Sequence, residues 1–586
     1  MKRLVGAISI GAFMLSTTLA QGEKQDWNAQ FQKASDDYFD QVYFPYQPSS
    51  GTSTGYHQYD AQLEDYSRKS INAEVAALKR FEQRIEAIRP GEDSADFVAR
   101  TDREIVLNDI RSRLLELETI RLWEKDPDVY SSTAANGAFT LMERKFAPAN
   151  ERLRSLIARE KKMPGLLAQA RENLKNPPRV YTETAIEQLP GNISFFEQDL
   201  PQAFEEATDP ALKAEFAQTN AAVIAALKEY EKWLETDLLP RSNGDFRIGA
   251  ETFQKKLKYD EMIDIPLPRL LEIGWADLKK NQAQFKKVAG ELEPNKDPRE
   301  VLAELGADHP APDQLLNTFR STFDGLVAFI RSHHIVTIPS DVRPTLEETP
   351  PFMRATTFAS MDTPGPYETH STTAYFNVTL PDKSMSPAEV DGFMHAFNVG
   401  TVISTAVHEA YPGHYVQFLW VPQAPSRVRK LLGANTNVEG WAHYCEQMML
   451  DEGYGQPGMG AKDERESRFL RLGQLQDALL RNARFIVGIE MHTGTMSYDQ
   501  AVEFFQKEGY QSKESAEVEA RRGTADPTYL YYTLGKLEIM KLREDLKKKQ
   551  GAAFSLEEFH NNFLRQGFPP VKIVREALLG DDSPTL

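Results

Sequence analysis

Residues 400–414 read GTVISTAVHEAYPGH, a run of small and apolar residues that ends in two histidines and a glutamate. An apolar run of this kind is typical of a buried helix. At its end, His408, Glu409 and His414 cost free energy unless a partner such as a metal ion satisfies their polar groups. The stretch therefore predicts a mainly helical protein in which one helix carries metal ligands.

The spacing of the two histidines differs from the usual helical zinc motif. In His-Glu-x-x-His the histidines are four residues apart and share one helical face. His408 and His414 are six residues apart, which is about 120° around and about 9 Å along a straight helix. Pro412 cannot donate to the carbonyl of His408, and Gly413 accepts backbone angles closed to other residues. We therefore expect the helix to break between the histidines and to bring His414 back toward His408.

A second polar motif begins at Glu439 and includes His443 and Glu446. These positions are i, i+4 and i+7, so the three side chains share one helical face. Two histidines and one carboxylate bind zinc in catalytic sites that keep a fourth position for water. The sequence thus predicts His408, His414 and Glu439 as zinc ligands, with Glu446 as the alternative carboxylate. If Glu439 is the ligand, Glu446 or His443 would orient a ligand.

The two motifs together resemble a known bacterial family. They read HEAYPGHYVQ (408–417) and EGWA (439–442), and two later segments read GIEMHTG (488–494) and YTLGK (532–536). This combination resembles the domain of unknown function 885 family, which looks like a group of zincin-type metallopeptidases with a mainly helical fold. The resemblance covers most of the chain after its first residues.

The resemblance also implies roles for individual residues. Zn²⁺ would be the cofactor, and Glu409 would activate the water bound to it. Tyr532 would donate a hydrogen bond to the oxyanion, although its neighbours Tyr529 and Tyr531 leave that assignment open. His492 is a second candidate for the same role. For His492 and Tyr532, ordinary packing is the alternative to a role in catalysis.

The rest of the chain predicts two helical regions. Apolar residues recur every three or four positions from about residue 27 to 334, as in a set of packed helices. Prolines interrupt residues 337–352, so we place a boundary there, with an N-terminal region at 21–335 and a catalytic zincin-like region at 336–586. One continuous helical fold with a central groove is the alternative. Residues 372–380 predict a strand beside the active-site helix, and residues 387–411 predict that helix.

The N-terminus predicts export. Lys2 and Arg3 precede an apolar run, and the small-x-small ending at Ala20 predicts a signal peptide at residues 1–20, cleaved after Ala20. We therefore expect a secreted or periplasmic protein without a transmembrane segment. The only cysteine is Cys445, which excludes an intramolecular disulfide. The formal charge of −18 argues against nucleic acid as a partner, and the oligomeric state is left open.

These features together predict a zinc metallopeptidase that hydrolyses peptides. Glu409 favours an enzyme, because a structural zinc site needs no such carboxylate. Two alternatives stay open: a non-catalytic zinc-containing protein that binds peptides, and a zinc hydrolase of a non-peptide amide or ester. The strand within residues 375–380 would favour peptides if its edge were free to pair with an extended substrate.

Overall fold

The structure is a computed structural model that describes residues 27–89, 96–350, 353–354 and 357–586. The predicted signal peptide at residues 1–20 lies outside the described residues. The described chain is mainly helical, as the sequence predicted. None of its described helices combines the length and the apolar character that crossing a membrane requires.

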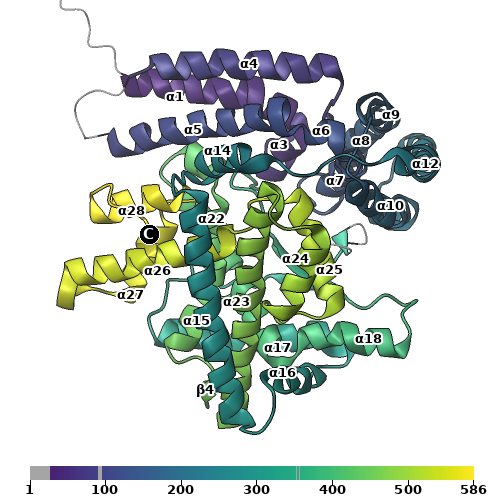
Figure 1. Cartoon of the computed structure of the whole chain (residues 1–586). Coiled ribbons are helices and arrows are strands. Elements are labelled where there is room, and N and C mark those ends of the chain that lie inside the picture. Colours follow the sequence, from purple (N-terminus) through teal and green to yellow (C-terminus); the bar gives the residue numbers. More distant parts are fainter. Residues whose placement is uncertain (1–26, 90–95, 351–352, 355–356) are drawn as a thin grey trace, which may run out of the picture.

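Helices α1 to α17 make up the first half of the chain (Figure 1). They are α1 (Trp27–Tyr38), α2 (Phe44–Tyr46), α3 (Pro48–Thr54), α4 (Arg68–Ala87), α5 (Phe97–Leu115), α6 (Leu122–Lys125), α7 (Asp128–Met142), α8 (Ala149–Glu160), α9 (Met163–Asn173), α10 (Arg179–Ser194), α11 (Leu200–Ala203), α12 (Pro210–Trp233), α13 (Leu239–Arg241), α14 (Gly249–Glu261), α15 (Leu267–Leu292), α16 (Pro298–Ala307) and α17 (Leu315–Ser332). Short π or 3₁₀ turns link several of them: η1 (Phe39–Tyr43), η2 (His57–Tyr59), η4 (Glu116–Ile120), η5 (Phe195–Asp199), η6 (Leu234–Leu238) and η7 (Pro312–Gln314).

Helices α18 to α28 form most of the second half. They are α18 (Pro387–Met394), α19 (Val399–Glu409), α20 (His414–Trp420), α21 (Arg427–Leu431), α22 (Asn435–Asp451), α23 (Glu464–Thr493), α24 (Tyr498–Lys507), α25 (Lys513–Ala525), α26 (Tyr531–Gln550), α27 (Leu556–Leu564) and α28 (Val571–Leu579). The 3₁₀ turns η9 (His395–Phe397), η10 (Val421–Gln423) and η11 (Gly551–Ala553) lie between them, and β4 (Gln456–Pro457) and β5 (Gly460–Ala461) pair in parallel as a two-stranded sheet.

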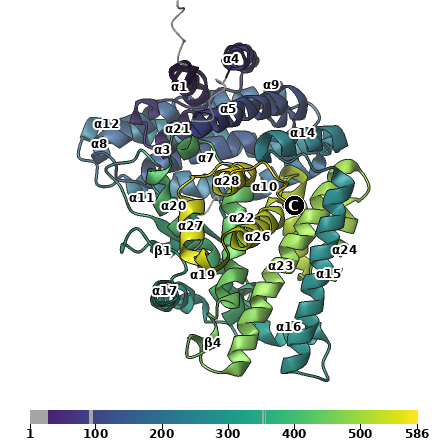
Figure 2. The ribbon, with the colours of Figure 1, turned by 90° about the vertical axis from the view of Figure 1, so that its left-hand side faces the viewer.

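A layer of N-terminal helices lies across one end of the long C-terminal helices. In Figures 1 and 2, α1, α4 and α5 cover the end of the long helices at which α22 begins and α23 ends. A buried ion pair joins the two parts, because Nε of Arg429 on α21 donates to Oδ1 of Asp102 on α5 at 2.9 Å. The buried stripe of α5, including Ile110, packs in the same region. The layer and the long helices are thus connected through packed, polar and apolar contacts.

The predicted single helix over residues 387–411 was wrong in its extent. The chain instead forms α18, η9 and α19, with a break at Asn398. The backbone of Asn398 is extended, and its side chain accepts hydrogen bonds from the backbone N–H groups of Gly400 and Thr401. Because asparagine satisfies these otherwise unpaired groups, it starts a new helix here. The apolar run therefore belongs to α19 alone.

A three-stranded sheet lies beside α19, as the sequence predicted for a small β element. Its strands are β1 (Thr345–Glu348), β2 (Ala359–Asp362) and β3 (Tyr375–Val378), in the order β1-β3-β2. β3 pairs with β1 in parallel and with β2 antiparallel. The strand predicted within residues 372–380 is thus central and has no free edge. The outer strands are β1 and β2, so the free edge that was predicted for β3 lies on these strands instead.

Helices α22 and α26 cross with their backbones in contact. A Cβ atom on Gly440 would lie 2.6 Å from the Cα of Gly535, which is too close for any side chain. Glycine at both positions therefore permits this approach. As a result, the start of α22 with Glu439 and the start of α26 with Tyr532 face the same space.

Candidate active site

The break between the two histidines occurs where the sequence predicted it. Helix α19 ends at Glu409, the Tyr411–Pro412 peptide bond is cis, and α20 begins at His414. A Cβ on Gly413 would overlap the carbonyl oxygen of His408, so only glycine fits this turn. The His408 and His414 rings lie 4.8 Å apart between centroids and are nearly perpendicular. The break thus brings the two imidazoles together despite their spacing in the sequence.

Glu439 on α22, which is half-buried, joins the two buried histidines in a group of three ligand candidates. Its Oε2 lies 3.4 Å from Nε2 of His408 and 3.4 Å from Nε2 of His414. Ligand atoms that bind one zinc tetrahedrally at about 2.1 Å lie roughly 3.4 Å apart. Oε2 of Glu439 is buried and receives no hydrogen bond. A cation between these three atoms would satisfy the oxygen, so the residues fit a bound zinc ion.

Glu446 contacts His408 at Nδ1, the ring nitrogen that does not face Glu439. One of its oxygens lies 2.7 Å from Nδ1 of His408, and the other lies 3.0 Å from Nδ1 of His443. Nη2 of Arg481 is 3.3 Å from the same carboxylate. A hydrogen bond from Nδ1–H of His408 to Glu446 leaves the Nε2 lone pair directed toward Glu439 and free to bind a metal. Of the two open alternatives, Glu446 contacts the ligand candidate His408, and His443 contacts Glu446.

The charges around His408 favour a cation at this position. Burial disfavours a charged imidazole, but the carboxylates of Glu439 and Glu446 outweigh it and raise the pKa of His408 to about 9. Burial likewise opposes ionisation of Glu439, but His414 and His408 hold the pKa of this carboxyl well below its usual range. The carboxylates thus stabilise positive charge among these side chains, whether the charge is carried by protons or by a metal ion.

Changing Glu446 to Gln is expected to weaken zinc binding about ten- to a hundredfold, because the variant keeps the shape of the side chain but not its charge. Equilibrium competition with a fluorescent zinc chelator measures the change. Glu452→Gln is the matched control: it removes a carboxylate that pairs with Arg543 at 2.6 Å at the end of the same helix. Equal affinity in the Glu446→Gln and Glu452→Gln variants would exclude an orienting role for Glu446.

The three ligand candidates open onto a cavity of about 830 Å³. Its walls come from β2 and from helices α19, α20, α22, α23, α25 and α26. Glu409 is buried to 8% exposure, lines this cavity and has no hydrogen-bond partner among the described residues. A carboxylate that is free of partners beside the ligand group can accept a proton from a bound water. Glu409 is therefore a candidate general base and not one of the three ligand candidates.

Tyr532 is the tyrosine of its segment that reaches the cavity. Its ring centroid lies 6.4 Å from that of His408, and its hydroxyl accepts a hydrogen bond from Arg522 at 3.2 Å. This bond leaves the hydroxyl proton available to a substrate. Tyr531 instead donates to Asp526 at 2.8 Å, and Tyr529 does not line the cavity. Burial, together with Glu439, raises the pKa of Tyr532, so its hydroxyl stays protonated.

The structure does not bring His492 to this cavity. Its ring is buried, packs against Phe246 and Phe253, and has Nε2 2.8 Å from the carbonyl oxygen of Gly523. Burial lowers the pKa of His492 to about 4, so the ring is neutral at pH 7. Its contacts are those of a packed core residue, and it has no place in the mechanism proposed below.

Three arginines beside Tyr532 were not predicted from the sequence. Arg481, Arg484 and Arg522 all lie over its ring, with guanidinium carbons 5.6, 4.9 and 5.7 Å from the centroid. The side chain of Glu519 forms two hydrogen bonds with Arg484. Arg481 and Arg484 occupy i and i+3 on α23, whose buried residues are mostly apolar, and that pattern is the signal that could have been used in the sequence.

Comparisons with known proteins agree with this fold. The structure of a putative lipoprotein of unknown function from Shewanella oneidensis is 28% identical, with a TM-score of 0.75 over 94% of this chain and 99% of that chain. A putative lipoprotein from Colwellia psychrerythraea is 18% identical, with a TM-score of 0.78 over 95% and 98% of the two chains, and shares the fold. A search of the curated proteins finds no match. Residues 48–578 match a family described as a bacterial protein of unknown function, DUF885, and the chain therefore belongs to the DUF885 family.

Proposed function

We propose that this protein is a zinc-dependent hydrolase that cleaves peptide bonds. One observation supports the proposal above all: the converging side chains of His408, His414 and Glu439 line the same cavity as the unpaired carboxylate of Glu409. Two histidines and a carboxylate leave a zinc position open for water. Glu409, beside that position, distinguishes the site from a structural zinc site.

In the proposed reaction, each of these cavity residues has its own role. Bound zinc would supply a Lewis acid that polarises the substrate carbonyl and acidifies the attacking water. Glu409 takes a proton from this water as its oxygen bonds to the carbonyl carbon, and then delivers the proton to the leaving nitrogen as the C–N bond breaks. Tyr532 donates a hydrogen bond from its hydroxyl to the carbonyl oxygen, where negative charge develops. Arg522 positions that hydroxyl.

The position of β2 supports a peptide as the substrate. Ala359, Ser360 and Met361 of this outer strand line the cavity. A strand with one unpaired edge can bind an extended peptide through backbone hydrogen bonds. The cavity volume of about 830 Å³ accommodates a few residues of such a chain. The two related structures are described as putative lipoproteins, which supports the export predicted from residues 1–20.

Incubation of the purified protein with a mixed peptide library tests the proposal. We expect mass spectrometry to detect cleaved products with the zinc-loaded protein, none after chelation, and restored cleavage after zinc is returned. The masses also separate terminal from internal cleavage. Peptides that bind without being cleaved would support a zinc-containing binding protein instead, and cleavage of simple amides or esters alone would support the non-peptide hydrolase.

Replacing Tyr532 by Phe is expected to lower kcat about a hundred- to a thousandfold, because one hydrogen bond to the oxyanion is lost. KM should change much less, since the ring and its packing remain. Tyr531→Phe is the control, as it removes a hydroxyl that donates to Asp526. Steady-state kinetics on a library-derived peptide measures both variants. An equal loss in the two variants would contradict the role of Tyr532.

A further inference from the structure

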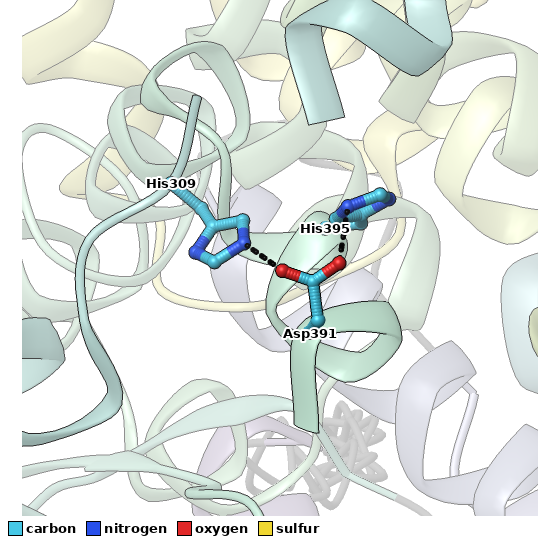
Figure 3. Close-up of side chains that lie close together, drawn as sticks. All are labelled: His309, Asp391 and His395. Carbon is cyan, nitrogen blue, oxygen red and sulfur yellow. Dashed lines mark hydrogen bonds and ion pairs between the residues drawn. The ribbon is translucent and has the colours of Figure 1, made fainter. Parts of the chain in front are cut away.

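A second group of potential metal ligands lies apart from the three central ligand candidates. His309 follows α16, Asp391 is on α18, and His395 begins η9. Figure 3 shows both imidazoles turned toward the Asp391 carboxylate between them. Nε2 of His309 lies 3.3 Å from one carboxylate oxygen, and Nε2 of His395 lies 3.4 Å from the other.

These separations match those of the central group. There, each histidine nitrogen is 3.4 Å from a Glu439 oxygen. One ligand atom from each of His309, Asp391 and His395 also lies within 4.8 Å of the others. Small side-chain rotations would bring all three to about 2.1 Å from one ion. Asp391 and His395 are four residues apart, so the helix turn holds them on one face.

A backbone carbonyl sets the tautomer of one of these histidines. Nδ1 of His309 lies 2.9 Å from the carbonyl oxygen of Pro310, so it carries the proton and donates. Nε2 of a neutral His309 then presents its lone pair to the space beside Asp391. Histidines that bind metals usually have their other nitrogen held in this way. The cluster thus combines three ligand candidates with a hydrogen bond from His309 to the backbone.

Outside the two groups already described, His57 and His334 lie near carboxylates without such convergence. His57 faces Asp60 through Nδ1 and Glu368 through Nε2, so its carboxylates lie on opposite sides of the ring. His334 pairs with one carboxylate, that of Glu557, through Nδ1. At Asp391, by contrast, no lysine or arginine of the described chain forms an ion pair, and two Nε2 atoms meet one carboxylate.

We propose that His309, Asp391 and His395 form a second zinc site at the rim of the cavity. His395 lines the cavity, and its η9 turn leads through Asn398 into α19, which carries His408. The side chains of Asp391 and His395 are 65% and 41% exposed. Water can therefore reach the ion and complete its coordination, and we expect weaker binding than at the buried central site. Bound zinc would join the loop after α16 to η9.

Equilibrium dialysis of the purified protein against graded zinc concentrations tests this site. We expect one tightly bound equivalent and a second that fills at higher zinc. Asp391→Asn and His395→Asn should each lose the second equivalent and keep the first. His334→Ala is the matched control, because it removes an exposed histidine beside a single carboxylate, and should keep both equivalents.

Anomalous X-ray scattering from zinc-soaked crystals locates the second ion directly, and a peak between His309 and Asp391 is expected. Rim variants that still bind two equivalents, or wild-type protein that binds no second equivalent, would overturn the proposal. Melting of the metal-free variants checks that these exposed substitutions leave the fold intact. Failure of the central site would remove the tight equivalent instead, so the two proposals are tested separately.

Discussion

Replacing Glu409 by Gln is expected to lower turnover about a hundred- to ten-thousandfold while zinc stays bound. The amide keeps the size of the side chain but cannot accept and deliver a proton. The Glu409 carboxylate lines the cavity and is not part of the converging group of three ligand candidates, so their geometry should persist. Zinc content by elemental analysis and peptide turnover, measured on one preparation, check the two halves of this expectation.

The paired measurement assigns each failure to a cause. Loss of zinc from Glu409→Gln would make Glu409 a ligand and would contradict the proposed ligand set. Full activity with zinc retained would place the general base elsewhere. The Glu452→Gln variant serves as the control, since it neutralises a glutamate that pairs with Arg543 outside the cavity. Its zinc content and its turnover should both match those of the wild type.

The double substitution His408→Ala, His414→Ala is expected to abolish tight zinc binding and, with it, peptide cleavage. Two of the three proposed ligands are lost, and Glu439 alone offers a single carboxylate. After dialysis against metal-free buffer, wild-type protein should retain about one zinc per chain and the variant none. Elemental analysis of both proteins, in parallel with the turnover assay, measures the effect.

Changing His333 and His334 to Ala is the matched control for the number of histidines lost. Both residues are exposed and lie near the end of α17, so this variant should keep its zinc and its activity. Circular dichroism should show that the His408, His414 variant is still helical. Full zinc occupancy in that folded variant would exclude both histidines as ligands.

Much of the local structure follows from the sequence because neighbouring residues determine it. The apolar run before His408 forms α19, and Pro412 with Gly413 ends it, since proline lacks a donor and Gly413 sits against a carbonyl oxygen. The i, i+4, i+7 pattern of Glu439, His443 and Glu446 follows from helix geometry alone. The start of α19 was missed, because the capping role of Asn398 depends on how the segment before it turns.

The helical class and the break after Glu409 follow from the sequence, as does the choice of His408, His414 and Glu439 as ligand candidates. All of these depend on bonds and contacts between residues close in the chain. Which distant side chains share a cavity follows from the tertiary structure: Tyr532 lies beside His408, His492 lies in the core, and β3 lies between the outer strands β1 and β2. Such choices depend on helix crossings such as that of α22 with α26. Those crossings result from packing over the whole chain, which no local pattern encodes.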